Sequence, residues 1–176
     1  MFTENDYQVV RSGGGSVHVF IAEDRTTSSV TTTMKPGEPV KKSAASGNYV
    51  IPLATGDPEI GTDEFVGVVF KESTETASAD GEVEVFVVQP LRTLLRAKPT
   101  TTTNMDTQSE LNGLKLDWVA GDVTASTGTN GIFTIDEDET DDADVHGFQI
   151  IDGDIRALTL DFQVHSMVCE AGPYVS

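Results

Sequence analysis

The sequence predicts an all-β protein, with a small β-barrel, β-tulip-like or sandwich body, an extended N-terminal arm and at most one or two short helices. Short segments rich in Val, Ile, Thr and Phe recur about every ten residues from residue 35 onward, and clusters of Gly, Pro, Asn and Asp separate them. The chain of 176 residues falls in the size range of one domain. We therefore expect roughly eight to ten short strands around one modest core.

The N-terminal part is predicted to form a flexible arm over residues 1–33, ahead of a β-rich body over residues 34–176. Residues 11–16 read Arg-Ser-Gly-Gly-Gly-Ser, a run too flexible to pack unaided, and we interpret it as a hinge. Residues 17–21 have strand character, but the Thr- and Ser-rich residues 26–33 have little to bury. An arm that becomes ordered on a neighbouring molecule fits this pattern.

The body contains the remaining predicted strands. The segments at residues 65–70 and 83–88 are expected to form a hairpin with a long loop, because the turn signal Asp80-Gly81 precedes the second. In the last strand, Leu158, Leu160, Phe162 and Val164 share one face. In chain order, strands are expected at residues 38–41, 49–53, 65–70, 83–88, 114–119, 131–135, 147–151 and 158–164.

Three connections in the body are predicted from local signals. Residues 90–98 combine helical leucine spacing with a leading proline, and we assign them to strand or irregular structure. One or two turns of helix are expected near residues 104–111. Asp152-Gly153-Asp154 predicts the tight turn between the final two strands.

Acidic residues dominate the charge of the chain, with 29 Asp and Glu against 11 Lys and Arg and a formal net charge of -18. The resulting negative field repels nucleic acid and anionic lipid, so we expect neither as a partner. Solubility at high local concentration is the simplest explanation of the charge. No run of 18 apolar residues or N-terminal leader pattern occurs, and we expect a protein that is cytoplasmic when made. The single cysteine, Cys169, excludes an intrachain disulfide and a Cys-based zinc site.

An acidic stretch at residues 135–140 resembles a catalytic motif. An apolar strand that runs into Asp-x-Asp-x-Thr is similar to the nucleophile motif of haloacid-dehalogenase-type phosphatases, where Asp136 would attack phosphorus and Asp138 would act as acid and base. Only 40 residues follow Asp136, which is too few for the helices, lysine and second acidic pair of that chemistry. The phosphatase interpretation is therefore disfavoured.

The same stretch could bind a hard cation through the carboxylates of Asp136, Asp138 and Asp142. A calcium-binding EF-hand loop requires Gly at its sixth position and Glu at its twelfth, where this sequence has Asp141 and Phe148. We favour a solvated acidic loop over weak calcium binding.

Other chemistry-bearing residues lack partners at suitable spacing. The histidines are far apart in sequence, none has a second histidine or cysteine at ligand spacing, and no Gly-x-Ser-x-Gly elbow exposes a nucleophile. The glycine run also lacks the lysine of a phosphate loop. We therefore predict no enzyme activity, no catalytic, metal or cofactor-binding residue and no cofactor; the residues considered and set aside are Gly13, Gly14, Gly15, His18, His146, His165 and Cys169.

The segment from Arg96 to Val164 resembles the decoration or cement proteins of tailed-bacteriophage capsids. The features that carry the resemblance are Arg-Ala-Lys-Pro-Thr-Thr at residues 96–101, a capped turn before Leu-Asn-Gly-Leu at residues 111–114, Gly-Ile-Phe-Thr-Ile-Asp-Glu-Asp-Glu at residues 131–139, Gly-Phe-Gln-Ile-Ile-Asp-Gly-Asp at residues 147–154 and the closing strand at residues 158–164. Other virion proteins, including head fibres and spike bases, have similar sequence features.

The resemblance implies a β-barrel or β-tulip-like body that forms homo-oligomers, trimers above all or dimers, and attaches to the major capsid protein at local symmetry axes. It implies a location on the capsid exterior of the virion, after assembly in the host cytoplasm, and it transfers no catalytic residues. The expected function is binding and stabilising a capsid, with the N-terminal arm contacting a neighbour. The alternative is a receptor- or glycan-binding module of a virion fibre or spike, which the low aromatic content of 7% and a single tryptophan, Trp118, do not favour.

Overall fold

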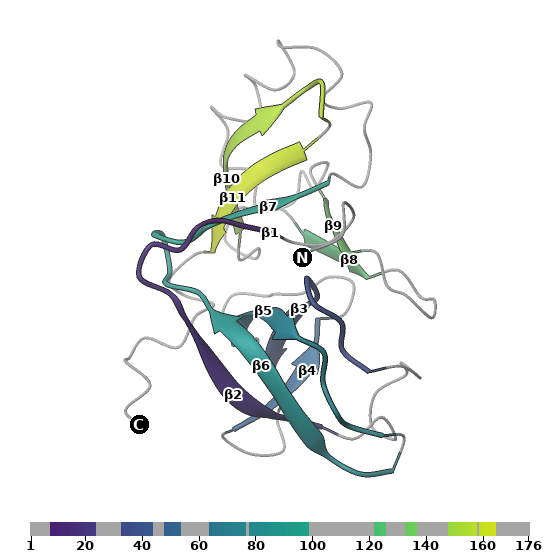
Figure 1. Cartoon of the computed structure of the whole chain (residues 1–176). Coiled ribbons are helices and arrows are strands. Elements are labelled where there is room, and N and C mark those ends of the chain that lie inside the picture. Colours follow the sequence, from purple (N-terminus) through teal and green to yellow (C-terminus); the bar gives the residue numbers. More distant parts are fainter. Residues whose placement is uncertain are drawn as a thin grey trace.

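The protein is all-β, as its sequence predicts. The computed structural model describes residues 8–23, 33–43, 48–53, 64–76, 78–98, 122–125, 133–136, 148–157 and 159–164, with only the backbone described at 122–125, 133–136 and 148–150. Within these ranges the chain forms eleven strands and no helix. The strands build a closed five-stranded barrel, a four-stranded sheet and a two-stranded sheet (Figure 1).

The barrel consists of β2 (Ser16–Ala22), β3 (Pro39–Lys42), β4 (Tyr49–Pro52), β5 (Phe65–Lys71) and β6 (Gly81–Val87), in the order β2-β4-β3-β5-β6. Its longest ladder joins β2 to β6 over seven antiparallel residue pairs. The predicted hairpin of β5 and β6 is present and antiparallel. Parallel pairing of β2 with β4, at Ile21↔Tyr49 and Ala22↔Val50, closes the ring.

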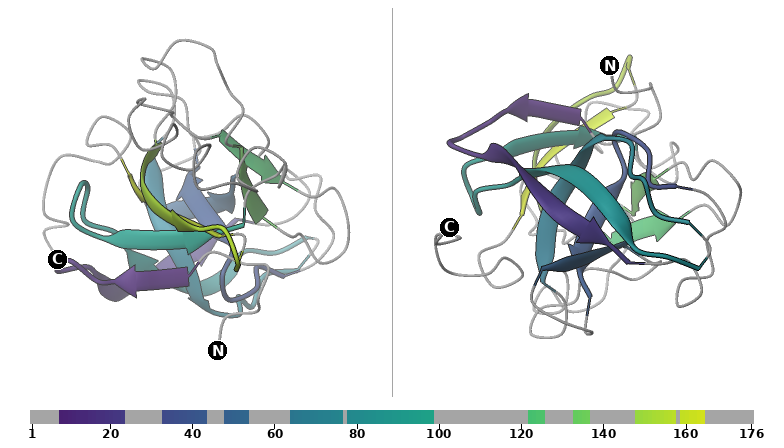
Figure 2. Two further views of the ribbon diagram at one scale, coloured as in Figure 1. Left: turned by 90° about the horizontal axis from the view of Figure 1, so that it is seen from above. Right: turned by 60° about the horizontal axis from the view of Figure 1, so that its bottom comes forward.

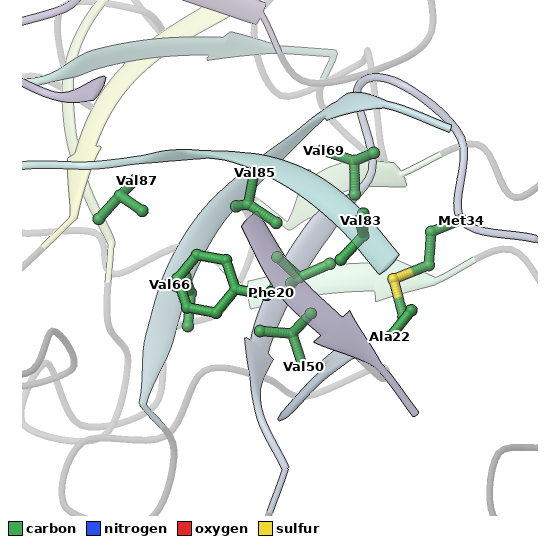
Figure 3. Close-up of a cluster of buried hydrophobic side chains, with 10 residues drawn as sticks. Phe20, Ala22, Met34, Val50, Val66, Val69, Val83, Val85 and Val87 are labelled. Atoms are coloured by element: carbon green, nitrogen blue, oxygen red, sulfur yellow. The ribbon is translucent and has the colours of Figure 1, made fainter. Parts of the chain in front are cut away.

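Valine fills most of the barrel interior. Along β6, Val83, Val85 and Val87 are buried, whereas Glu82, Glu84 and Phe86 alternate with them on the other side, as the two-residue period of a strand requires. β-Branched side chains suit such a pleated surface because their χ1 angles are already restricted. The core cluster comprises Phe20, Ala22, Met34, Val40, Val50, Val66, Val69, Val83, Val85 and Val87 (Figure 3).

The second sheet lies above the barrel in Figure 1. It has the order β1-β7-β11-β10, with β1 (Gln8–Arg11), β7 (Leu94–Ala97), β11 (Thr159–Val164) and β10 (Phe148–Asp154) all antiparallel to their neighbours. Its own buried side chains include Leu95, Leu160 and Phe162. The short strands β8 (Asp122–Ala125) and β9 (Phe133–Asp136) form the third sheet, and Figure 2 shows all three from two further directions.

Two adjacent turns carry the chain between the four-stranded sheet and the barrel. Residues 12–15 link β1 to β2, and residues 88–93 link β6 to β7. The Thr93 hydroxyl donates to the carbonyl of Ser12 at 2.7 Å, so the two turns are bonded to each other. Gly13 has a φ of 58°, and a β-carbon there would overlap the backbone of Arg92.

The N-terminal strands belong to the body, which corrects the predicted arm and hinge over the residues that the structure describes. β1 pairs with β7, β2 pairs with β6, and Phe20 and Ala22 are in the barrel core. The glycine run is a packed turn because its neighbours leave no room for side chains at Gly13 or Gly15. Residues 1–7 and 24–32 lie outside the described ranges.

Other local predictions differ from the structure in detail. Asp152-Gly153-Asp154 belongs to β10, and the turn follows at residues 155–157, because Asp154 accepts hydrogen bonds from the N–H groups of Arg156 and Ala157. By contrast, the prediction of strand or irregular structure at residues 90–98 is confirmed, because a turn at residues 90–93 leads into β7. The helix predicted near residues 104–111 and the strand at 114–119 fall outside the described residues.

Candidate interaction surface

Three of the large apolar side chains that remain exposed lie on the outside of the barrel, on two strands that flank a third. Val19 and Val17 of β2 are 58% and 40% exposed, and Phe70 of β5 is 52% exposed. β6 lies between these two strands. Because Phe20 and Ala22 of β2 point into the core, Val17 and Val19 point outward by the alternation of a strand.

The strand register brings these side chains into one patch. Val17 pairs with Phe86 and Val19 pairs with Glu84, so each pair has β-carbons about 5 Å apart. On the other side of β6, Lys71 of β5 pairs with Glu84. We call the residues Val17, Val19, Phe70, Glu84 and Phe86 the outer barrel face.

A β-bulge in β5 lies at Phe70. Val69 pairs with Val85 and Lys71 pairs with Glu84, which leaves Phe70 as the extra residue of β5. Val69 is fully buried in the core, whereas Phe70 is exposed. Because Val69 points into the core, the alternation of the strand directs Phe70 outward, and the bulge leaves Lys71 exposed as well.

Similar irregularities expose apolar side chains at both edges of the four-stranded sheet. The register shifts between Val9 and Arg11 in β1, and between Ile150 and Asp152 in β10. Val10 and Ile151 are the extra residues, and both are exposed. Bulges also disrupt the regular hydrogen bonding of edge strands, which limits uncontrolled strand addition.

Charged groups lie within and beside the outer barrel face. The Lys71 ammonium lies 3.0 Å from Oε1 of Glu84, and both side chains are solvent-accessible. The adjacent Glu72 accepts hydrogen bonds from Lys35 and Thr33, which lower the pKa of its carboxyl group. The Glu84–Lys71 ion pair thus lies within the patch, with Val19 of β2 on one side of Glu84 and Phe70 of β5 on the other.

A second polar cluster holds the four-stranded sheet together. Arg96 of β7 donates from Nε and Nη2 to the two carboxylate oxygens of Asp161 on β11, at 2.6 and 2.9 Å. Asp161 is buried. The Asp161 hydrogen bonds raise the pKa of Arg96, and the charges of Asp154 and Asp152 act in the same direction. This bidentate ion pair joins neighbouring strands of the sheet.

One hydroxyl–imidazole contact occurs on β2. The Ser16 hydroxyl lies 2.7 Å from Nε2 of His18, and both residues are exposed. A hydroxyl bonded to an imidazole is half of a nucleophilic arrangement. Their partners across the ladder are Val87 and Val85, which supply apolar side chains there. The contact by itself does not make a catalytic site.

The structure locates few of the residues weighed as sites from sequence. Asp136 ends β9 and pairs with Asp122 of β8, with only its backbone described. Among the described residues, no group of three or more His, Cys, Asp or Glu side chains could hold a metal ion. Those outside the described ranges are Trp118, Asp138, Asp142, His146, His165 and Cys169.

The sequence reasoning missed the outer barrel face. Residues 65–70 are apolar throughout and were expected to form a strand, but nothing in their composition marks the bulge at Phe70. The alternation in Ser-Val-His-Val-Phe-Ile-Ala over residues 16–22 was an available signal, since it indicates a strand with two different faces.

Comparisons with known proteins provide no family assignment. No protein-family model matches the chain. No curated protein sequence matches it either. In the ranges that the structure covers, no helix has both the length and the apolar character needed to cross a membrane.

Proposed function

We propose that this protein is a structural virion component that binds the outer surface of a bacteriophage capsid and stabilises it, and that it is not an enzyme. The outer barrel face carries the proposal, because its apolar side chains are presented outward on paired strands. Contiguous exposed apolar groups are a common feature of protein interaction sites. The resemblance of residues 96–164 to capsid decoration proteins supplies the partner, the major capsid protein.

The charge of the chain is compatible with this role. A protein that carries a net charge of -18 is repelled by a packaged genome. The same charge favours solubility at the high local concentration on a virion. Electrostatics therefore support a protein that stays outside the shell.

Self-association completes the proposal. We expect a homo-oligomer, with a trimer ahead of a dimer, because a decoration protein that binds at a local symmetry axis repeats its contacts around that axis. Several weak contacts made together give an avidity far above that of each contact alone. A lattice-binding oligomer needs no deep pocket.

The capsid contact is assigned to the folded body. The part of the predicted arm that the structure describes is in β1 and β2, where it supplies core and ladder residues. A surface built on paired strands loses little conformational entropy when it binds, because its backbone is already ordered.

Sedimentation tests the proposal directly. The pure protein is analysed for its mass in solution, and it is then cosedimented with empty capsid shells of the virus that encodes it, stripped of the native protein. We expect an oligomer that pellets with the shells at a fixed stoichiometry and raises their melting temperature. Shells that already carry the native protein are the control, since their sites are filled.

Two results would contradict the proposal. If the protein stays in the supernatant with stripped shells, capsid binding is wrong. If it instead binds defined sugars on a glycan array, the alternative of a receptor- or glycan-binding module of a fibre or spike replaces it.

A further inference from the structure

We infer that the outer barrel face is the surface that docks on the shell, and that the partner presents an apolar patch bordered by Lys or Arg side chains. The inference rests on the proposed function and adds to it the side of the molecule that faces the capsid and the chemistry of the surface opposite. The shell protein, and not a second copy of this chain, is the partner that binds at this face.

Rigidity is the first argument. β2 and β6 share seven residue pairs, and β5 pairs with the other side of β6, so the three strands form one continuous ladder. The ring of Phe86 lies where a β-carbon of Gly15 would be, which fixes the ring against the turn that precedes β2. A surface held in this way is organised for binding before the partner arrives.

The exposed ring of Phe70 is the second argument. Val69 is paired with Val85 in the core, so the alternation of β5 directs the next residue, Phe70, outward. An exposed aromatic ring on the same outer side of the barrel as Val19 and Val17 is costly in water and favourable in a contact. Aromatic side chains are enriched at the centres of protein interfaces.

Charge complementarity selects the occupant. On the outward side of β6 the chain carries Glu82 and Glu84, and Lys71 is the cation beside them. If two copies met through this face, Glu82 and Glu84 of both copies would be brought together, which disfavours a second copy as the occupant. A partner with basic residues around an apolar patch gains attraction in place of repulsion.

Three variants at exposed apolar positions test the surface. Val19→Asp and Phe70→Asp place a carboxylate on the outer barrel face, and Ile151→Asp places one at an exposed apolar position on the edge strand β10. Because all three positions are exposed, each variant should melt within a few degrees of the parent protein. We expect binding to stripped capsid shells to weaken at least about tenfold for the first two and less than about twofold for Ile151→Asp.

A cysteine footprint measures the contact independently of affinity. In a Cys169→Ser background, Val19→Cys is labelled with a maleimide in free protein and after binding to shells, with Ala157→Cys in the exposed β10–β11 turn as the control. We expect protection of the cysteine at position 19 on shells and unchanged labelling at position 157.

The possible outcomes separately test the proposed function, the docking face and the identity of the partner. If the parent protein does not bind shells, the proposed function fails, and the inference fails with it. If the parent binds but position 19 stays reactive and Val19→Asp binds normally, the inference is wrong while the function stands. If the parent is an oligomer that Val19→Asp dissociates, a second copy occupies the face and our assignment of the occupant is overturned.

Discussion

Gly13 lies in the turn between β1 and β2, with a φ of 58° in the left-handed region. A β-carbon at this position would overlap the carbonyl of Arg92 in the neighbouring turn. Two separate effects therefore require glycine here, a backbone conformation that other residues rarely adopt and a close approach of two backbones. The turn is consequently part of the packed structure.

Replacing Gly13 by Ala should destabilise the protein by about 1 to 3 kcal/mol, because the turn must shift away from Arg92 or take up strain. Urea unfolding of the variant measures the change. Ser12→Ala is the matched control, since it alters an exposed side chain in the same turn and keeps the carbonyl that Thr93 uses. A stability equal to that of the parent would restore the hinge interpretation.

Asp154 gives a prediction about pH. The N–H groups of Ala157 and Arg156 donate to its carboxylate and lower its pKa from the ordinary value of 3.8. A carboxyl group whose folded pKa is lowered stabilises the fold above its unfolded pKa, and the contribution disappears as pH falls through the folded pKa. We expect the Asp154 carboxyl carbon to titrate below pH 3.8 by NMR.

The Asp154→Asn variant completes that test. It should abolish the contribution that the Asp154 carboxylate makes to the pH dependence of the unfolding free energy, while the amide oxygen still accepts hydrogen bonds. An Asp154 resonance that titrates at or above the ordinary value would show that the turn does not hold the carboxylate.

Strands were predictable where their partner is near in the sequence. A loop of nine residues with a clear turn signal separates β5 from β6, and this signal predicts the hairpin. β11 was predicted from its alternating apolar residues, of which Leu160, Phe162 and Val164 are buried. Local patterns are sufficient in these cases.

The remaining elements depend on contacts between distant residues. The segment at residues 17–21 has strand character, but its partner β6 lies more than fifty residues further along the chain, and no local signal reports that pairing. Without the partner, a short strand beside a glycine run is indistinguishable from an arm. The bulge at Phe70 escaped prediction for a related reason, because it depends on the register of β5 against β6, which the local sequence does not specify.

Removal of β2 should unfold the barrel. A protein that lacks residues 1–23 loses the seven-pair ladder with β6 and the core side chains Phe20 and Ala22. We expect it to show no cooperative thermal transition by circular dichroism. The milder variant Phe20→Ala in the full chain should cost about 3 to 5 kcal/mol.

The results would differ if the N-terminal residues formed a dispensable arm. The truncated protein would then melt at the temperature of the parent, and Phe20→Ala would leave the unfolding free energy almost unchanged. Val19→Ala is the matched control for the point variant, because it removes an exposed side chain from the same strand.

At the scale of the whole molecule, net charge and exposed apolar surface have opposing effects on association. The chain is strongly anionic at pH 7, and its isoelectric point is about 4.2. Repulsion between copies opposes contact between two outer barrel faces at neutral pH. That repulsion vanishes where the net charge reaches zero.

Light scattering should therefore rise as the pH is lowered towards 4.2, with the folded state verified at each pH by circular dichroism. Val19→Ser should scatter less than the parent, because it reduces the apolar area of the outer barrel face. Val10→Ser, at an exposed position on the edge strand β1, is the comparison. Scattering that stays flat through the isoelectric point would show that charge does not control association.

The paired turns that connect the barrel to the four-stranded sheet have a mechanical consequence. The two connections run side by side, and the Thr93 hydroxyl and the closely packed Gly13 link them. A single connection would act as a swivel, whereas two linked ones resist torsion. A load on the barrel would thus be shared by both strands and delivered to the sheet as a shear along β1 and β7.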